Sequence, residues 1–183
     1  MKSTGIVRRI DGLGRVVLPK EIRKTLKLNS GDLLQIFVEK EVIILEKYSP
    51  ISTYDKTIDA VAECLFQTAN LPVVITDNQS VVQAKGTAQR LKGEKLSQTL
   101  IEIIENKSSY IINSSDGGVI KKITQAGNEE EFLSQIIVTV IGVENQPLGA
   151  VILLDTKVGG QMGLKEVSLV NLASKMLTMK LDS

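Results

Sequence analysis

The fold of this chain is decided by the stretch GLGRVVLPKEIRKTL, which runs from Gly12 to Leu26. Gly12 and Gly14 indicate a tight turn, because glycine enters positive φ without steric cost. The apolar, mainly β-branched residues 16–18 favour a short strand. Pro19 is typical of the first turn of a helix, where its missing N–H would have had no partner. The stretch therefore predicts a turn, a strand and a helix in succession.

The helix that is expected after Pro19 carries positive charge on one face. Its cations recur at positions i, i+3, i+4 and i+7, which share one side at about 100° per residue. They are Lys20, Arg23, Lys24 and Lys27. Ile22 and Leu26 lie on the opposite face, which we expect to point to a core. Such a stripe is either a solvated helix surface or a binding surface for a polyanion.

The distribution of charge along the chain favours the polyanion. No stripe cation has an acidic residue four positions away that could neutralise it. Arg8, Arg9 and Arg15 lie on the flanking strand and turn and would extend the basic patch. Residues 1–30 hold eight Lys/Arg and two Asp/Glu, net +6, so the remainder is net −5 to give the total of +1. We therefore expect a polyanionic partner at the N-terminal end.

Composition narrows the class of protein. A chain of 183 residues, 43% of them hydrophobic, forms one large or two small domains with an adequate core. It has no histidine and one cysteine, Cys64, which excludes histidine-dependent nucleophile pairs and multi-cysteine zinc sites. We therefore assign no catalytic residue and no metal ligand, and expect a protein that is not an enzyme. No signal peptide or long apolar run is present, so we expect a cytoplasmic protein without a membrane partner.

The first 50 residues form a small β-rich unit. Strands are expected at residues 5–10, 33–39 and 42–45, with a turn at Lys40-Glu41. A unit of this size buries too little surface to be stable alone, and both faces of its strands carry large apolar groups. We expect two copies to complete one core. The alternative is a monomer packed on a second domain.

The run from Gly5 to Leu45, with the quoted stretch at its centre and Ser-Gly-Asp after the helix, resembles the AbrB-type swapped-hairpin DNA-binding domain. This resemblance implies an interleaved dimer of β-hairpins whose basic residues contact duplex DNA. Carried over by position, the implied contacts and the further candidates are Arg8, Arg15, Arg23 and Lys24, then Arg9, Lys20 and Lys2. Lys24 is a point charge that cannot make a bidentate pair. The same β dimer also serves antitoxins, so an antitoxin-like protein-binding module is the alternative function.

Residues 58–183 are expected to form a second domain after a linker at 51–57. Apolar periodicity predicts helices at 59–69, 96–105 and 164–180, and strands at 72–76, 81–84, 110–112, 119–120, 132–143 and 148–154. The last helix has two apolar stripes, one through Leu172 and Met176 and another through Val170 and Leu177. We expect one stripe to pack on the domain's own sheet and the other on a partner subunit.

This element order resembles a GAF domain, an antiparallel sheet flanked by helices, and the hairpin at 147–152 is its most family-like part. The resemblance implies either a small-molecule effector held between the sheet and the middle loops or a purely dimerising module. The sequence identifies no ligand, and we assign no cofactor. The fold class expected for the whole chain is α+β. Two dimer contacts per chain would give a homotetramer, which we expect to associate with the nucleoid.

Overall fold

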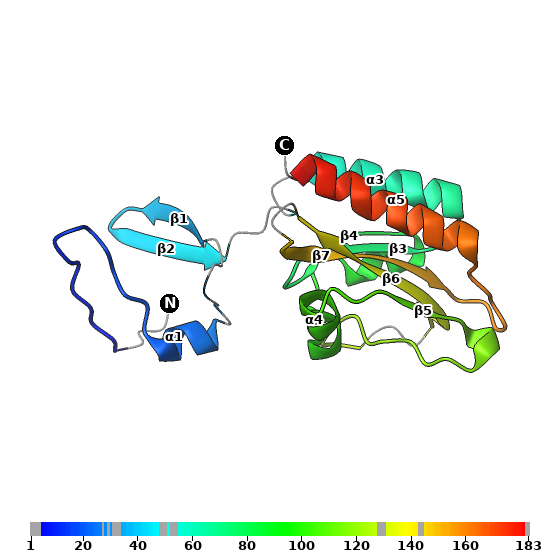
Figure 1. The fold of residues 1–183 in the computed structure, drawn as a ribbon, viewed down its shortest axis with the longest axis horizontal. Coiled ribbons are helices and arrows are strands. Elements are labelled where there is room, and N and C mark those ends of the chain that lie inside the picture. The colour runs from blue at the N-terminus through cyan, green and yellow to red at the C-terminus, as the bar shows by residue number, and fades with distance from the viewer. Residues whose placement is uncertain are drawn as a thin grey trace. The chain divides into compact units, whose positions relative to one another are not determined.

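The computed structural model describes residues 5–26, 28, 30, 34–47, 51, 55–127, 131–142 and 145–181. The chain divides into two compact units, Met1–Tyr48 and Ser49–Ser183 (Figure 1). We call them the N-terminal unit and the C-terminal unit. Within the described residues, no helix combines the length and the apolar character that crossing a membrane requires.

The N-terminal unit holds one short helix and one hairpin. Helix α1 (Lys20–Thr25) is followed by strands β1 (Leu34–Glu39) and β2 (Val42–Lys47). The two strands are antiparallel, with Glu39 opposite Val42, so the predicted Lys40-Glu41 turn is confirmed. The predicted strands at 5–10 and 16–18 are not formed in the single chain. A strand exists only where a neighbouring strand accepts its backbone hydrogen bonds, and β1 and β2 pair with each other.

The described part of the N-terminal unit has no buried core. None of its described residues is buried, and Leu26 is exposed while Ile22 is half-buried. The hairpin carries apolar groups on both faces, since Val38 lies opposite Ile43 and Phe37 lies opposite Ile44 on the other face. The expectation that α1 points to a core is therefore not met within one chain.

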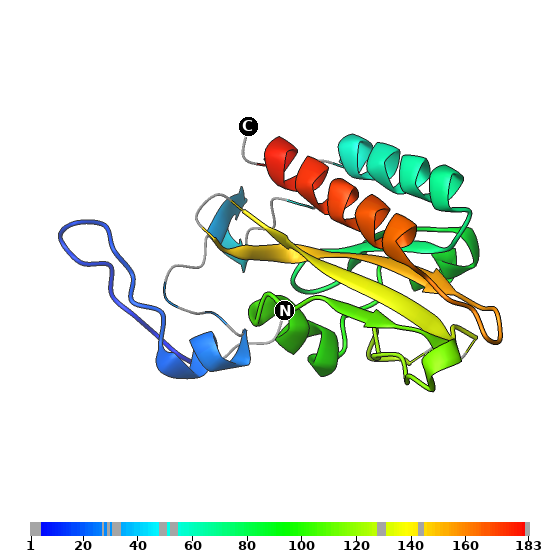
Figure 2. The same cartoon turned by 45° about the vertical axis from the view of Figure 1, so that its right-hand side comes forward.

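The C-terminal unit is built on a five-stranded antiparallel sheet in the order β4-β3-β7-β6-β5. The strands are β3 (Val73–Thr76), β4 (Val81–Lys85), β5 (Tyr110–Ile112), β6 (Ser134–Ile141) and β7 (Pro147–Asp155). Helices α3 (Asp55–Ala69) and α5 (Leu164–Leu181) lie side by side on one face (Figures 1 and 2). The other face is covered by α4 (Gln98–Glu105) and the 3-10 helix η1 (Gly86–Leu91), and a second 3-10 turn, η2, spans Ser114–Asp116.

Both faces of this sheet are buried, which explains why its central strands read as continuous apolar runs. On β7, Val151 and Leu153 pack toward α3 and α5, while Ile152 and Leu154 pack toward α4. This alternation follows the two-residue period of a strand. The second core includes Leu100 of α4 together with Phe132 and Ile137.

Most predicted elements of this unit are confirmed to within one residue at each end, and four differ. Helix α4 begins at Gln98 rather than 96. Helix α3 begins at Asp55 rather than 59, and Ile51 is buried in its core, so the expected linker at 51–57 is partly structured. The strand predicted at 119–120 is not formed. The strand predicted at 132–143 is shorter, at 134–141, and residue 143 lies outside the described residues.

Candidate nucleic-acid interface

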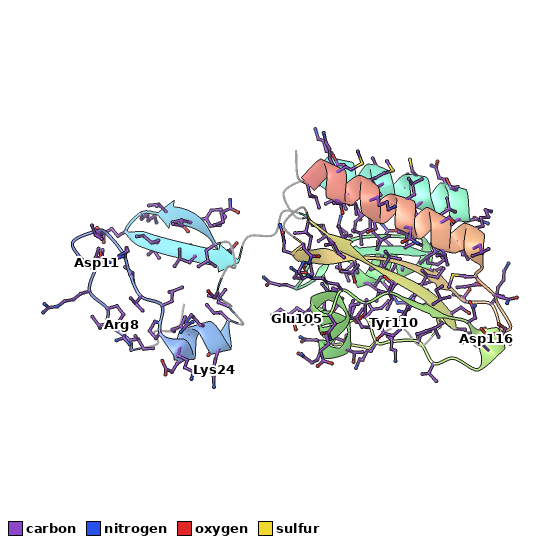
Figure 3. The ribbon with its side chains drawn as sticks, viewed as in Figure 1. Arg8, Asp11, Lys24, Glu105, Tyr110 and Asp116 are labelled. Atoms are coloured by element: carbon purple, nitrogen blue, oxygen red, sulfur yellow. The ribbon has the colours of Figure 1, made fainter. Side chains whose placement is uncertain are left out.

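The candidate DNA-binding cations lie on three elements of the N-terminal unit, and all are exposed. Arg8 and Arg9 belong to the extended segment 5–10, Arg15 follows the first turn, and Lys20, Arg23 and Lys24 belong to α1. Figure 3 shows Arg8 on the extended segment, Lys24 on the helix and Asp11 in the loop between them. Lys2 and Lys27 lie outside the described residues.

The turn at 11–15 is organised by the carboxylate of Asp11. Its Oδ1 accepts hydrogen bonds from the backbone N–H groups of Leu13 and Arg15, both at 2.9 Å. Two backbone hydrogen bonds also close the turn. The Asp11 N–H donates to the carbonyl of Arg15 at 3.1 Å, and the Gly14 N–H donates to the carbonyl of Asp11 at 3.0 Å. Gly14 has φ +76°, as the sequence predicts, whereas Gly12 does not adopt positive φ. The turn therefore depends on one glycine and one aspartate.

The same carboxylate binds the side chain of Arg15. The Arg15 Nε donates to Asp11 Oδ2 at 2.8 Å, and the two side chains remain 71% and 41% exposed, respectively. The backbone N–H of Arg15, its guanidinium and the N–H of Leu13 hold the pKa of Asp11 below its ordinary value. Asp11 is therefore negatively charged at neutral pH, the condition in which Arg15 is expected to meet a polyanion.

Helix α1 presents its cations near its C-terminal end. Pro19 occupies the N-cap with extended backbone angles, one position before the predicted first turn. Arg23 and Lys24 stand in the last turn, where positive charge is favourable beside the helix dipole. The Leu28 N–H closes that end by donating to the carbonyl of Arg23 at 2.8 Å. Among the described residues, no acidic side chain forms an ion pair with Lys20, Arg23 or Lys24.

Sequence reasoning based this turn on Gly12 and Gly14 and missed the contact of Asp11 with Arg15. The signal in the sequence was an aspartate opening a glycine-rich turn, since Asp side chains accept hydrogen bonds from N–H groups two or more residues ahead. In the C-terminal unit, the described residues hold no cluster of three or more potential metal ligands. The single chain therefore concentrates its exposed candidate contacts in the N-terminal unit but spreads them over three elements.

Comparison with known proteins supports both resemblances. Residues 55–182 match the family model described as "Stage V sporulation protein T C-terminal, transcription factor", and residues 7–53 match "Antidote-toxin recognition MazE, bacterial antitoxin". Stage V sporulation protein T of Bacillus subtilis (strain 168) is 36% identical over 155 residues, which are 84% of each chain. Transition state regulatory protein AbrB of the same organism is 56% identical over 57 residues, which are 31% of this chain and 59% of AbrB.

The fold of the C-terminal unit is shared with a solved GAF domain. The GAF domain of an Acinetobacter phosphoenolpyruvate-protein phosphotransferase superposes with a TM-score of 0.56 at 13% identity, over 74% of this chain and 84% of that one. At this identity the likeness shows the fold alone, and it confirms the predicted α+β, GAF-like architecture. The match over residues 55–182 and the likeness along 84% of the sporulation protein extend through nearly the whole sequence. The chain therefore belongs to the stage V sporulation protein T family of transcription factors, with an AbrB-type domain followed by a GAF-like domain.

Proposed function

We propose that this transcription regulator binds duplex DNA through its N-terminal unit, as a dimer in which two chains complete one core. The observation that supports it most directly is a unit with exposed cations, exposed apolar faces and no buried residue among those described. The relationship to AbrB supports DNA as the partner. The proposal includes no enzymatic activity.

The dimer follows from the apolar surface that the single hairpin leaves uncovered. Val38 and Ile43, which lie opposite each other on one face, are 74% and 67% exposed. On the extended segments, Val7 and Val17 are 85% and 74% exposed. Burial of such apolar surface in a dimer would stabilise the dimer by roughly 25 cal/mol per Å² of apolar area removed from water. A second copy would supply the neighbouring strands that residues 5–10 and 15–19 lack and would cover these side chains.

The proposed contacts are Arg8, Arg15, Arg23 and Lys24, with Arg9 and Lys20 as further candidates. Lysine and arginine side chains bind phosphates and release counterions, so affinity should fall steeply with salt. An arginine can in addition make a bidentate contact with the O6 and N7 atoms of guanine, which Lys24 cannot. Sequence preference is therefore assigned to the arginines.

The C-terminal unit is proposed to join two such dimers into a tetramer. On α5, Val170 and Leu177 are buried against the sheet, whereas Leu172 and Met176 are 57% and 49% exposed. An apolar stripe on a helix side that the sheet does not cover supports a second self-contact. We further propose a cytoplasmic protein at the nucleoid of the forespore, because the proposed partner is DNA and the relative is named a sporulation protein. Microscopy of a fluorescent fusion in a sporulating host tests this location.

The test is duplex binding by the full chain with Arg15→Ala and Arg23→Ala, measured by gel shift at several salt concentrations. Loss of a contact with a base edge should weaken binding to the preferred site by about 1–3 kcal/mol. Loss of a phosphate contact should weaken binding to all sequences alike and make the salt slope shallower by about one. Lys165→Ala, an exposed cation of the C-terminal unit, is the matched control and should bind like the wild type. Unchanged binding by both arginine variants would remove this surface from the proposal.

An antitoxin-like function is the second candidate, because residues 7–53 match an antitoxin model. A toxin-binding tail would follow this segment, whereas here α3 begins at Asp55 and a folded GAF-like unit follows. Native mass spectrometry of the chain purified from its own host separates the two functions. A stoichiometric toxin in the complex would favour the antitoxin, and homo-oligomers alone favour the DNA-binding regulator.

A further inference from the structure

The contact between Asp11 and Arg15 places a carboxylate directly on the proposed DNA-binding surface. We propose, on the basis of the proposed function, that Asp11 is a positioning residue for DNA recognition. It holds the Arg15 guanidinium by Nε and so directs the two Nη groups to the nucleic acid.

The two oxygens of the Asp11 carboxylate have separate tasks. Oδ1 accepts the backbone N–H groups of Leu13 and Arg15 and thereby shapes the turn. Oδ2 accepts Nε of Arg15 at 2.8 Å and thereby restrains the side chain. Because the turn shape and the side-chain restraint depend on different oxygens, a substitution can remove the second while keeping the first.

The nitrogen that Asp11 binds is the one that DNA recognition needs least. A guanidinium has five N–H donors, and the edge formed by the two Nη groups is suited to bidentate contact with a phosphate or with guanine. Nε is held by Asp11, and the Arg15 side chain is 71% exposed. The Nη edge is therefore available while the stem of the side chain is restrained.

Electrostatics alone would disfavour an aspartate at this place. A negative charge beside a surface that meets a polyanion lowers its affinity, and like-charge contacts oppose association. A restrained arginine, in contrast, loses less conformational freedom when it binds. The two effects have opposite signs, so the change in affinity on neutralising Asp11 separates a positioning residue from a mere charge.

The variant that makes this separation is Asp11→Asn. The amide oxygen of asparagine can still accept the N–H groups of Leu13 and Arg15, but its NH₂ group cannot accept a hydrogen bond from Nε. Duplex binding by the full chain is measured by fluorescence anisotropy, with a DNA site selected by the wild type and with random duplex. We expect Asp11→Asn to weaken binding to the selected site by about two- to tenfold, although it removes a negative charge from the proposed surface.

A charge-matched control variant and a double substitution complete the design. Glu21→Gln removes the same charge from an exposed residue of α1 without an ion pair among the described residues, and should bind equally or more tightly. In the Arg15→Ala background, Asp11→Asn should no longer weaken binding, because the side chain that it positions is absent. This non-additivity is the signature of residues that act together.

The same restraint has a spectroscopic readout that does not depend on DNA. In the free protein, the ¹⁵N–¹H signal of Arg15 Nε should be protected from exchange, and the protection should be lost in Asp11→Asn while circular dichroism stays unchanged. The proposal is overturned if Arg15 Nε is unprotected in the wild type, or if Asp11→Asn binds as tightly as Glu21→Gln. Failure of the proposed function looks different, since Arg15→Ala and Arg23→Ala would then both leave DNA binding unchanged.

Discussion

At the scale of single residues, two buried amide side chains take the place of neighbouring strands. Gln135 accepts the N–H of Lys121 at 2.8 Å and donates to its carbonyl at 3.1 Å. Asn113 accepts the N–H of Met162 at 2.9 Å and donates to its carbonyl at 3.3 Å. Each side chain satisfies both backbone groups of one residue, as a paired strand would. Lys121 is thus joined to β6 through a side chain and not through strand pairing, and the preceding residues 119–120 form no strand.

Gly149 is the residue whose replacement should disturb the sheet most directly. A Cβ at this position would stand 1.9 Å from the carbonyl oxygen of Thr76, a backbone atom of the neighbouring strand β3. We expect Gly149→Ala to lower the free energy of unfolding by roughly 1–3 kcal/mol or more, because β3 and β7 must separate. Urea denaturation followed by circular dichroism measures the change.

Gly163→Ala is the control for that substitution. The nearest atom to its Cβ would be Glu166 Oε2 at 3.9 Å, which is ordinary contact. Because Gly163 is the N-cap of α5, where alanine is less favourable than glycine, we expect a loss of stability of about 1 kcal/mol or less, smaller than that of Gly149→Ala. Equal midpoints for the two alanine variants would contradict the close approach of β7 to β3.

At the scale of elements, polar contacts of Lys85 and Gln83 join the edge strand β4 to α3. Lys85 Nζ lies 2.7 Å from Asp59 Oδ1 and 3.0 Å from Glu63 Oε2, and Gln83 Nε2 donates to Asp59 at 2.7 Å. Hydrogen bonding to Lys85 lowers the pKa of both carboxyl groups, and hydrogen bonding to Asp59 and then Glu63 raises the pKa of Lys85. The three charges therefore stabilise the folded state together.

The sign of these pKa shifts predicts a pH dependence. Carboxyl groups with lowered pKa stabilise the fold above their ordinary pKa of about 4, and this stabilisation is lost as the pH falls. A lysine with raised pKa stabilises the fold below its ordinary pKa of about 10.4 and loses this as the pH rises through the raised value. The contribution of this cluster should therefore be greatest between about pH 5 and 10.

Lys85→Met tests this prediction in urea denaturation at pH 7 and at pH 3. We expect the variant to be less stable than the wild type at pH 7, by a modest amount because the carboxylates are exposed. The difference should shrink at pH 3, because the stabilisation by carboxyl groups with a lowered pKa is lost as the pH falls below their ordinary pKa. Lys165→Met, whose lysine is exposed, serves as the control. A difference that is constant across pH would show that the packing of Lys85, not its charge, holds α3.

At the scale of the whole molecule, affinity for DNA should depend on assembly. Leu172→Glu combined with Met176→Glu places charges on the exposed stripe of α5 and leaves the buried stripe intact. We expect light scattering to show dimers in place of tetramers, because a desolvated carboxylate opposes packing. DNA binding should weaken as well, since linked sites raise the effective concentration of each other.

Two controls accompany the α5 variant. Asn171→Glu adds a charge at an exposed polar position of the same helix and should leave the tetramer intact. Val38→Glu acts on the N-terminal hairpin and should disrupt the other self-contact. A chain that remains tetrameric with both α5 substitutions would contradict the proposed role of this stripe, and a wild-type monomer would contradict both contacts.

The sequence by itself determined the elements whose signals are local. The positive φ at Gly14, the helix after Pro19, the Lys40-Glu41 turn and the element order of the GAF-like unit all follow from turn chemistry and apolar period. The candidate cations were also predicted from spacing and family resemblance, and their contacts with DNA stay a prediction.

Only the tertiary structure decided which atoms meet. The hydrogen bond from Arg15 to Asp11 forms because the turn brings the two side chains together. The hydrogen bond from Met162 to Asn113 joins residues 49 positions apart. The segment 5–10 has the composition of a strand but becomes one only when a neighbouring backbone satisfies its hydrogen bonds. Local propensity selects the shape of a segment, whereas pairing and burial depend on groups that are distant in the chain or supplied by another copy.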